Sequence, residues 1–164
     1  MAPPPSTTVP PVVALAIRSV TFVLILVSVI LMATNKIADA VKFSDFYAYR
    51  YMLAAGVIGM AYTLLQAALT LLYVITGNKI GGDGLSIVDF FGDKIVSYLL
   101  GTGAAACFGL TVDLKRINDQ GSDLDSDTDH FLNKANAAAA ILFIGFIFSA
   151  MSSIFSCLSL PKRG

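Results

Sequence analysis

The stretch VVALAIRSVTFVLILVSVILMA, residues 12–33, decides how the chain folds, because it is apolar throughout except for one arginine and three small hydroxyl side chains. A helix needs about 20 mostly apolar residues to cross the hydrocarbon core of a bilayer. This stretch is long enough, and Arg18 interrupts it without ending it. We therefore expect residues 12–33 to form a membrane-spanning helix.

Three further apolar runs follow, at about residues 51–75, 88–112 and 135–160. The chain has 164 residues, of which 56% are hydrophobic and 13% charged, and its mean hydropathy is +0.76. Ordinary soluble domains are much less apolar. The sequence thus predicts an all-α, integral membrane four-helix bundle, which forms one domain over residues 12–160.

The segments outside this domain are short. The arm MAPPPSTTVPP, residues 1–11, contains five prolines and predicts an extended, disordered segment. It lacks the basic start of a secretory signal, so we expect the first apolar run to be retained. Residues 161–164 form a short tail. Both cysteines, Cys107 and Cys157, fall in expected membrane helices, which favours free thiols over a disulfide.

Two charged residues interrupt the expected helices at similar depth. Arg18 lies about 9 Å into the first helix and Asp93 about 7 to 8 Å into the third, at 1.5 Å per residue. These helices run in the same direction, so both residues start from the same face of the membrane. Because a charge in hydrocarbon costs about 2.5 to 3.5 kcal/mol on insertion scales, we expect an intramembrane ion pair.

Two other interpretations of these charges stay open. Each side chain could extend separately to the lipid headgroups. Alternatively, the pair could gate an ion or proton path, for which the sequence offers chiefly Gln66 near the midplane. If the two charges do pair, the exchanged variant Arg18→Asp with Asp93→Arg is expected to recover assembly that either single variant loses.

Small residues recur at four-residue spacing, which lets helix backbones approach closely in lipid. They predict either packing within one bundle or an interface with a second copy of the chain, and the sequence does not separate the two. The third expected helix carries Gly101, Ala105 and Gly109, the fourth carries Gly145, Ser149, Ser153 and Cys157, and the second carries Ala55 and Gly59.

Two connections between the expected helices have unusual compositions. Residues 76–87, TGNKIGGDGLSI, are rich in glycine and predict a tight reversal. Residues 113–134 contain aspartates at alternate positions from Asp123 to Asp129. An EF-hand loop beginning at Asp123 would need glycine and glutamate where Thr128 and Lys134 stand. This segment therefore predicts a solvated acidic loop rather than a calcium site.

The sequence offers little for catalysis. It contains no glutamate and one histidine, His130, in the acidic segment, and no histidine or cysteine cluster has the spacing of metal ligands. We expect no enzymatic activity, no metal, no cofactor and no nucleic-acid partner. Two functions remain: a non-catalytic membrane scaffold that self-associates laterally, or a small channel, transporter or accessory subunit with a polar path through an oligomer.

Several of these features together resemble a known family. An arginine in the first helix, the stretch FYAYRYMLAAGVIGMAYTLLQ at residues 46–66, and an aspartate opening GDKIVSYLLGTGAAA at residues 92–106 are similar to the plant CASP-like (Casparian strip membrane protein-like) family, which is related to the MARVEL four-helix proteins. The family's hallmark arginine and aspartate correspond to Arg18 and Asp93.

This resemblance implies a plasma-membrane protein with both termini cytosolic, surrounded by membrane lipids, which forms homo-oligomers and mixed oligomers with relatives. The positive-inside rule leans slightly the other way on orientation. More basic residues fall on the side opposite the termini, namely Lys36, Lys42, Arg50, Lys115, Arg116 and Lys134, than on the terminal side, namely Lys79, Lys162 and Arg163, with Arg18 and Lys94 inside the helix ends.

One difference separates the chain from the strip-forming members of that family. Those members carry a string resembling E-S-L-P-F-F-T-Q-F in the first extracellular loop, whereas this loop reads TNKIADAVKFSDFYAYR, residues 34–50. The chain therefore resembles the CASP-like relatives rather than the strip-forming members.

Overall fold

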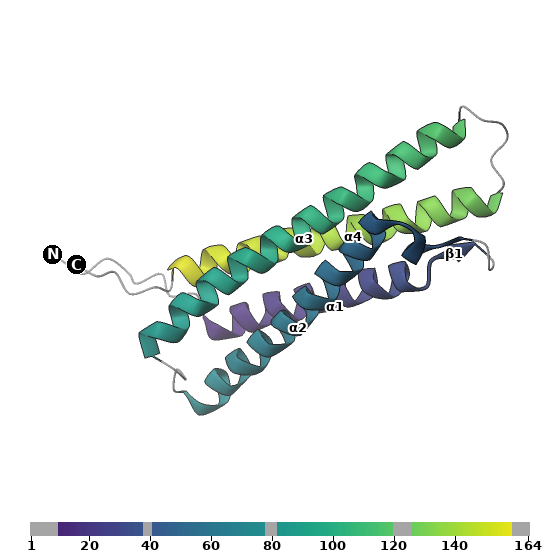
Figure 1. Cartoon of the computed structure of the whole chain (residues 1–164). Helices are drawn as coiled ribbons and strands as arrows, with labels where there is room; N and C mark the ends of the chain where they lie inside the picture. The colour runs from purple at the N-terminus through teal and green to yellow at the C-terminus, as the bar shows by residue number, and fades with distance from the viewer. Residues whose placement is uncertain (1–9, 38–40, 78–81, 120–125, 159–164) are drawn as a thin grey trace.

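Four long helices lie alongside one another in the computed structural model of the chain, which describes residues 10–37, 41–77, 82–119 and 126–158 (Figure 1). All four are long and apolar enough to cross a bilayer. The predicted all-α membrane bundle is therefore confirmed. The helices are α1 (Pro11–Ala33), α2 (Tyr47–Thr76), α3 (Gly82–Asp119) and α4 (Ser126–Leu158).

The helices form a closed ring. α1 packs against α2 and α4, and α3 packs against the same two helices, so α1 and α3 lie on a diagonal of the bundle. The first residues of α1 and the last residues of α4 lie at one end, which we call the terminal end (Figure 1). The centre is filled by fully buried apolar side chains, including Ile25, Leu100 and Leu142.

The helices run past the expected membrane segments, mainly at the end opposite the termini. α2 begins at Tyr47, α3 continues to Asp119, and α4 begins at Ser126. α3 has 38 residues and is therefore about 57 Å long, against about 30 Å for the hydrocarbon core. The sequence signal detected only the apolar part of each helix, because residues in water can continue a helix without being apolar.

The acidic segment is consequently less of a loop than expected. Asp127 and Asp129 lie in the first turn of α4, where negative charge favours the helix N-terminus. Lys115 of α3 donates to Asn133 of α4 at 2.7 Å and so joins the two extended ends. Asp123 and Asp125 lie outside the described residues. The prediction of a loop over residues 113–134 is therefore wrong for residues 113–119 and 126–134, which are helical.

The described residues on either side of the glycine-rich segment are a helix end and a helix start. Gly77 follows the helix with a positive φ of 69°, a conformation that glycine adopts without strain, and its N–H donates to the carbonyl of Tyr73 at 2.9 Å. α3 already begins at Gly82, so the second half of residues 76–87 is helical.

A small hairpin connects α1 to α2 at the end opposite the termini. Its strands are β1 (Lys36–Ile37) and β2 (Val41–Lys42), and the one-turn 3-10 helix η1 (Phe43–Asp45) follows. Asn35, which is 1% exposed, donates from Nδ2 to the carbonyl of Phe131 at 3.0 Å. This bond ties the base of the hairpin to α4.

Candidate functional site: a polar cluster around Arg18

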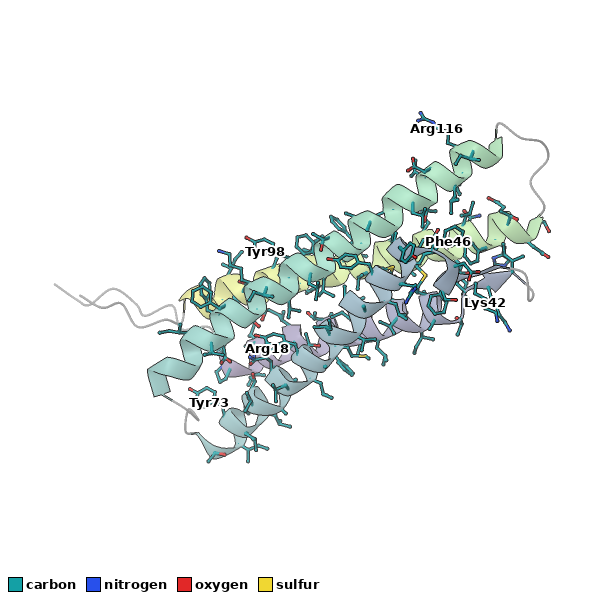
Figure 2. The ribbon with its side chains drawn as sticks, viewed as in Figure 1. Arg18, Lys42, Phe46, Tyr73, Tyr98 and Arg116 are labelled. Atoms are coloured by element: carbon teal, nitrogen blue, oxygen red, sulfur yellow. The ribbon has the colours of Figure 1, made fainter. Side chains whose placement is uncertain are left out.

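Polar side chains from three helices meet near the terminal end of the bundle. Tyr62, Gln66 and Thr70 are spaced four residues apart and therefore share one face of α2. Asp89 and Asp93 have the same spacing on α3. Arg18 of α1 lies within the bundle at the end that also carries Tyr73, whereas Lys42, Phe46 and Arg116 lie toward the opposite end (Figure 2).

The guanidinium of Arg18 binds four oxygen atoms. Nη1 donates to Oε1 of Gln66 at 2.8 Å, to the carbonyl of Gln66 at 3.0 Å and to Oγ1 of Thr70 at 2.8 Å. Nη2 lies 3.5 Å from Oδ2 of Asp93. The structure thus brings together the two charged residues that the sequence singled out, and it adds neutral acceptors from α2.

A second set of bonds holds the acceptors in place. Tyr62 donates to Oδ1 of Asp93 at 2.8 Å and lies 3.1 Å from the carbonyl of Asp89. Gln66 donates from Nε2 to the hydroxyl of Tyr62 at 3.1 Å and to Oδ1 of Asp89 at 2.7 Å. Because its oxygen accepts while its amide nitrogen donates, Gln66 connects the cation directly to Asp89 and, through the hydroxyl of Tyr62, to Asp93.

The cluster is buried inside the protein. Relative exposure is 10% for the Arg18 side chain and 5% for that of Asp93. Arg18 lies about 10 Å from the start of α1, at 1.5 Å per residue. In hydrocarbon a charge is tolerated when it faces the bundle and is compensated there. The guanidinium meets this condition through Gln66, Thr70 and Asp93 instead of extending to the headgroups.

Sequence reasoning missed Tyr62, Thr70 and Asp89. The four-residue spacing around Gln66 on α2 and around Asp93 on α3 was the available signal, because it places the extra groups on the face that carries the known ones. Tyrosine and threonine are common in membrane helices, so the spacing gains meaning only once Arg18 is known to face them.

The small residues of α4 point into the bundle. A Cβ added at Gly145 would lie 3.5 Å from Ile25 of α1, and Ser149 and Ser153 are buried. Gly59 of α2 is similarly enclosed, because an added Cβ would lie 2.8 Å from the side chain of Leu100. These residues therefore face the interior of the bundle.

The small residues of α3 divide between two faces. A Cβ added at Gly101 would lie 3.1 Å from Phe146 of α4, so this glycine faces its neighbour. Ala105 and Gly109 are exposed, and a Cβ added at Gly109 would meet nothing within 4 Å. We call Ala105 and Gly109, together with the exposed Thr102, the outer face of α3.

The remaining candidates form no reactive site among the described residues. Cys107 is a buried free thiol that donates to the carbonyl of Ala135 at 3.6 Å, and the side chain of Cys157 lies outside the described part. His130 is exposed at the start of α4. Within residues 10–37, 41–77, 82–119 and 126–158, no three histidine, cysteine, aspartate or glutamate side chains gather in a way that could hold a metal ion.

A ring of four apolar helices that encloses an arginine-centred polar cluster defines a multi-pass membrane protein. Residues 8–148 match the Casparian strip membrane protein domain, and the chain belongs to this CASP-like family. It is 46% identical to "CASP-like protein 4D1" of Ricinus communis, over 99% of each chain. It is 45% identical to "CASP-like protein 4D1" of Glycine max, over 98% of this chain and 94% of the relative.

A third relative, "CASP-like protein 4D2" of Arabidopsis thaliana, is 40% identical over 99% of both chains. These matches confirm the family resemblance that the sequence features carried. No solved structure matches the chain.

Proposed function

We propose that this protein is a non-catalytic scaffold of the plasma membrane, with both termini cytosolic, which associates laterally with copies of itself and with related chains. The observation that carries the proposal is the division of its small residues. Gly145 is used inside the bundle, whereas Ala105 and Gly109 lie on the outer face of α3. In lipid, such a face lets a second helix approach closely.

The interior of the bundle supports a scaffold over a channel. Beyond the Arg18 cluster, the described core is filled by Ile25, Leu100, Leu142 and Met52, which are at most 1% exposed. Polar groups nearer the opposite end are paired between helices, as Tyr49 of α2 is with Thr111 of α3 at 3.0 Å. A route for ions needs polar groups along its length, so a path through one bundle is disfavoured.

The proposal is tested by the variant Gly109→Leu in lipid vesicles, with oligomer size measured by chemical crosslinking or by counting photobleaching steps. The matched control is Ala140→Leu, because Ala140 is also small and exposed but lies on α4. We expect Gly109→Leu to weaken self-association about tenfold, which corresponds to about 1.4 kcal/mol, and the control to leave it unchanged.

Three results would contradict parts of this proposal. Equal oligomer formation in both variants would remove the outer face of α3 as the interface. A strictly monomeric wild-type protein would end the scaffold interpretation. Ion flux in reconstituted vesicles that is lost on Asp93→Asn would favour the channel instead. For orientation, a protease site placed on either terminus should be cut only from the cytosolic side.

A further inference from the structure

The guanidinium of Arg18 has one donor, Nε, that no described residue satisfies. Its Nε is buried and has no hydrogen-bond partner in the described part of the chain, although Nη1 and Nη2 are both bonded. An unpaired donor buried in a membrane protein is costly, because no bulk water is available to accept its hydrogen bond. A group that accepts a hydrogen bond is therefore needed beside Nε.

Arg18 also lines a small cavity of about 10 Å³. Its walls include Arg18 and Thr21 from α1, Asp93 from α3, and Ser149 and Ser152 from α4. Ser149 and Ser152 are 6% and 9% exposed, and their hydroxyls make no hydrogen bond to any described residue. Arg18, Ser149 and Ser152, which all line this cavity, thus each carry a hydrogen-bonding group with no partner among the described residues.

The size and charge of the cavity select the ligand. A cavity of this volume holds about one water molecule, and a buried water typically makes about three hydrogen bonds. A phosphate group is much larger. Asp93 also lines the cavity, and its negative charge would repel an anion, so the fitting ligand is small and neutral.

We propose that the cavity holds one ordered water molecule, which accepts a hydrogen bond from Nε of Arg18 and bonds to the hydroxyls of Ser149 and Ser152. This water connects α4 to the cluster. Among the described residues, the direct hydrogen-bond partners of Arg18 all come from α2 and α3. With the water in place, all four helices share one polar junction at the level of Arg18.

The proposal is tested on the wild-type protein in lipid nanodiscs, labelled with ¹⁵N-arginine, by solid-state NMR with magnetisation transferred from water. The Nε signal of Arg18 is assigned by its loss in Arg18→Lys. We expect this signal to receive magnetisation from water although the side chain is buried. A signal without transfer from water overturns the proposal, as does transfer from lipid headgroup protons, which would place a lipid oxygen in the cavity.

Valine substitutions add the structural control. Ser149→Val and Ser152→Val remove a hydroxyl and fill the cavity, so most of the transfer from water to Nε is expected to be lost in each. Ser153→Val is the matched control, because Ser153 is as buried as Ser152 but does not line the cavity. Equal loss in all three variants would overturn the proposal. If a variant fails to fold, the wild-type measurement still decides.

Discussion

Arg18 reaches Asp93 across the diagonal of the bundle, with 3.5 Å between Nη2 and Oδ2. α1 and α3 are not neighbours in the ring of helices, so only a long side chain can join them. On its way the guanidinium passes Gln66 of α2, whose side-chain oxygen is closer, at 2.8 Å. The ion pair is therefore one part of a three-helix junction in which a neutral amide carries the shorter bond.

Removing the charge of Asp93 should destabilise the protein strongly. Asp93→Asn leaves the buried guanidinium of Arg18 without its anion, and breaking a buried pair in this way costs about 3 kcal/mol. Asp89→Asn is the control, because Asp89 accepts from Gln66 but does not contact Arg18; we expect about 1 kcal/mol or less. Thermal unfolding in detergent measures both. Equal losses would show that the pair has no special role.

The hydroxyl of Tyr62 should matter more than that of a tyrosine on the surface. Tyr62→Phe removes a donor to Asp93 and an acceptor for Gln66, both within the cluster. We expect a loss of about 1 to 2 kcal/mol. Tyr51→Phe removes one exposed bond, to Thr102 at 2.8 Å, and should cost only a few tenths. A larger effect at Tyr51 in the same unfolding assay would contradict this ranking.

The Arg18 cluster also changes what a charge exchange should do. From sequence alone, Arg18→Asp with Asp93→Arg is expected to restore assembly. In the structure, an aspartate at position 18 is too short to cross the diagonal, and it would face two oxygens of Gln66 that accept hydrogen bonds from Arg18. We now expect the double variant to be no more stable than the better single variant. Full recovery of the melting temperature would contradict this view.

The sequence predicted the apolar, membrane-spanning parts of the helices well and the polar parts at their ends poorly. Apolar runs predicted four membrane helices, and equal depth pointed to Arg18 and Asp93. The extension of α3 and α4 beyond the bilayer was missed, because exposed helical turns such as those around Asp127 carry no apolar run. The sequence could not predict that Gly109 faces away from the bundle, because four-residue spacing is the same on inner and outer faces of a helix.

The bond between Asn35 and Phe131 should control the hairpin between α1 and α2. Asn35→Ala removes the buried Nδ2 donor that joins the base of the hairpin to the carbonyl of Phe131. We expect faster hydrogen exchange of the backbone amides in residues 41–45 and a stability loss of about 1 to 2 kcal/mol. Lys36→Ala, at an exposed position, is the control and should change neither. Unchanged exchange in Asn35→Ala would show that the hairpin is held by other contacts.

Gly56 and Gly109 should respond in opposite ways to the same added methyl group. A Cβ at Gly56 would lie 2.6 Å from Cγ2 of Val29, which is too close. Val29 is β-branched and has one strongly preferred rotamer in a helix, so it cannot turn away, and α1 and α2 must separate. We expect Gly56→Ala to destabilise the bundle by about 1 to 3 kcal/mol.

At Gly109 an added Cβ meets nothing within 4 Å, so Gly109→Ala should be neutral or stabilising by up to about 1 kcal/mol through its higher helix propensity. Thermal unfolding of detergent-solubilised monomers compares the two variants, since any contact between copies is then absent. If Gly109→Ala were as destabilising as Gly56→Ala under these conditions, the position of Gly109 on the outer face of α3 would be incorrect. The proposed interface would then have to lie elsewhere on the bundle.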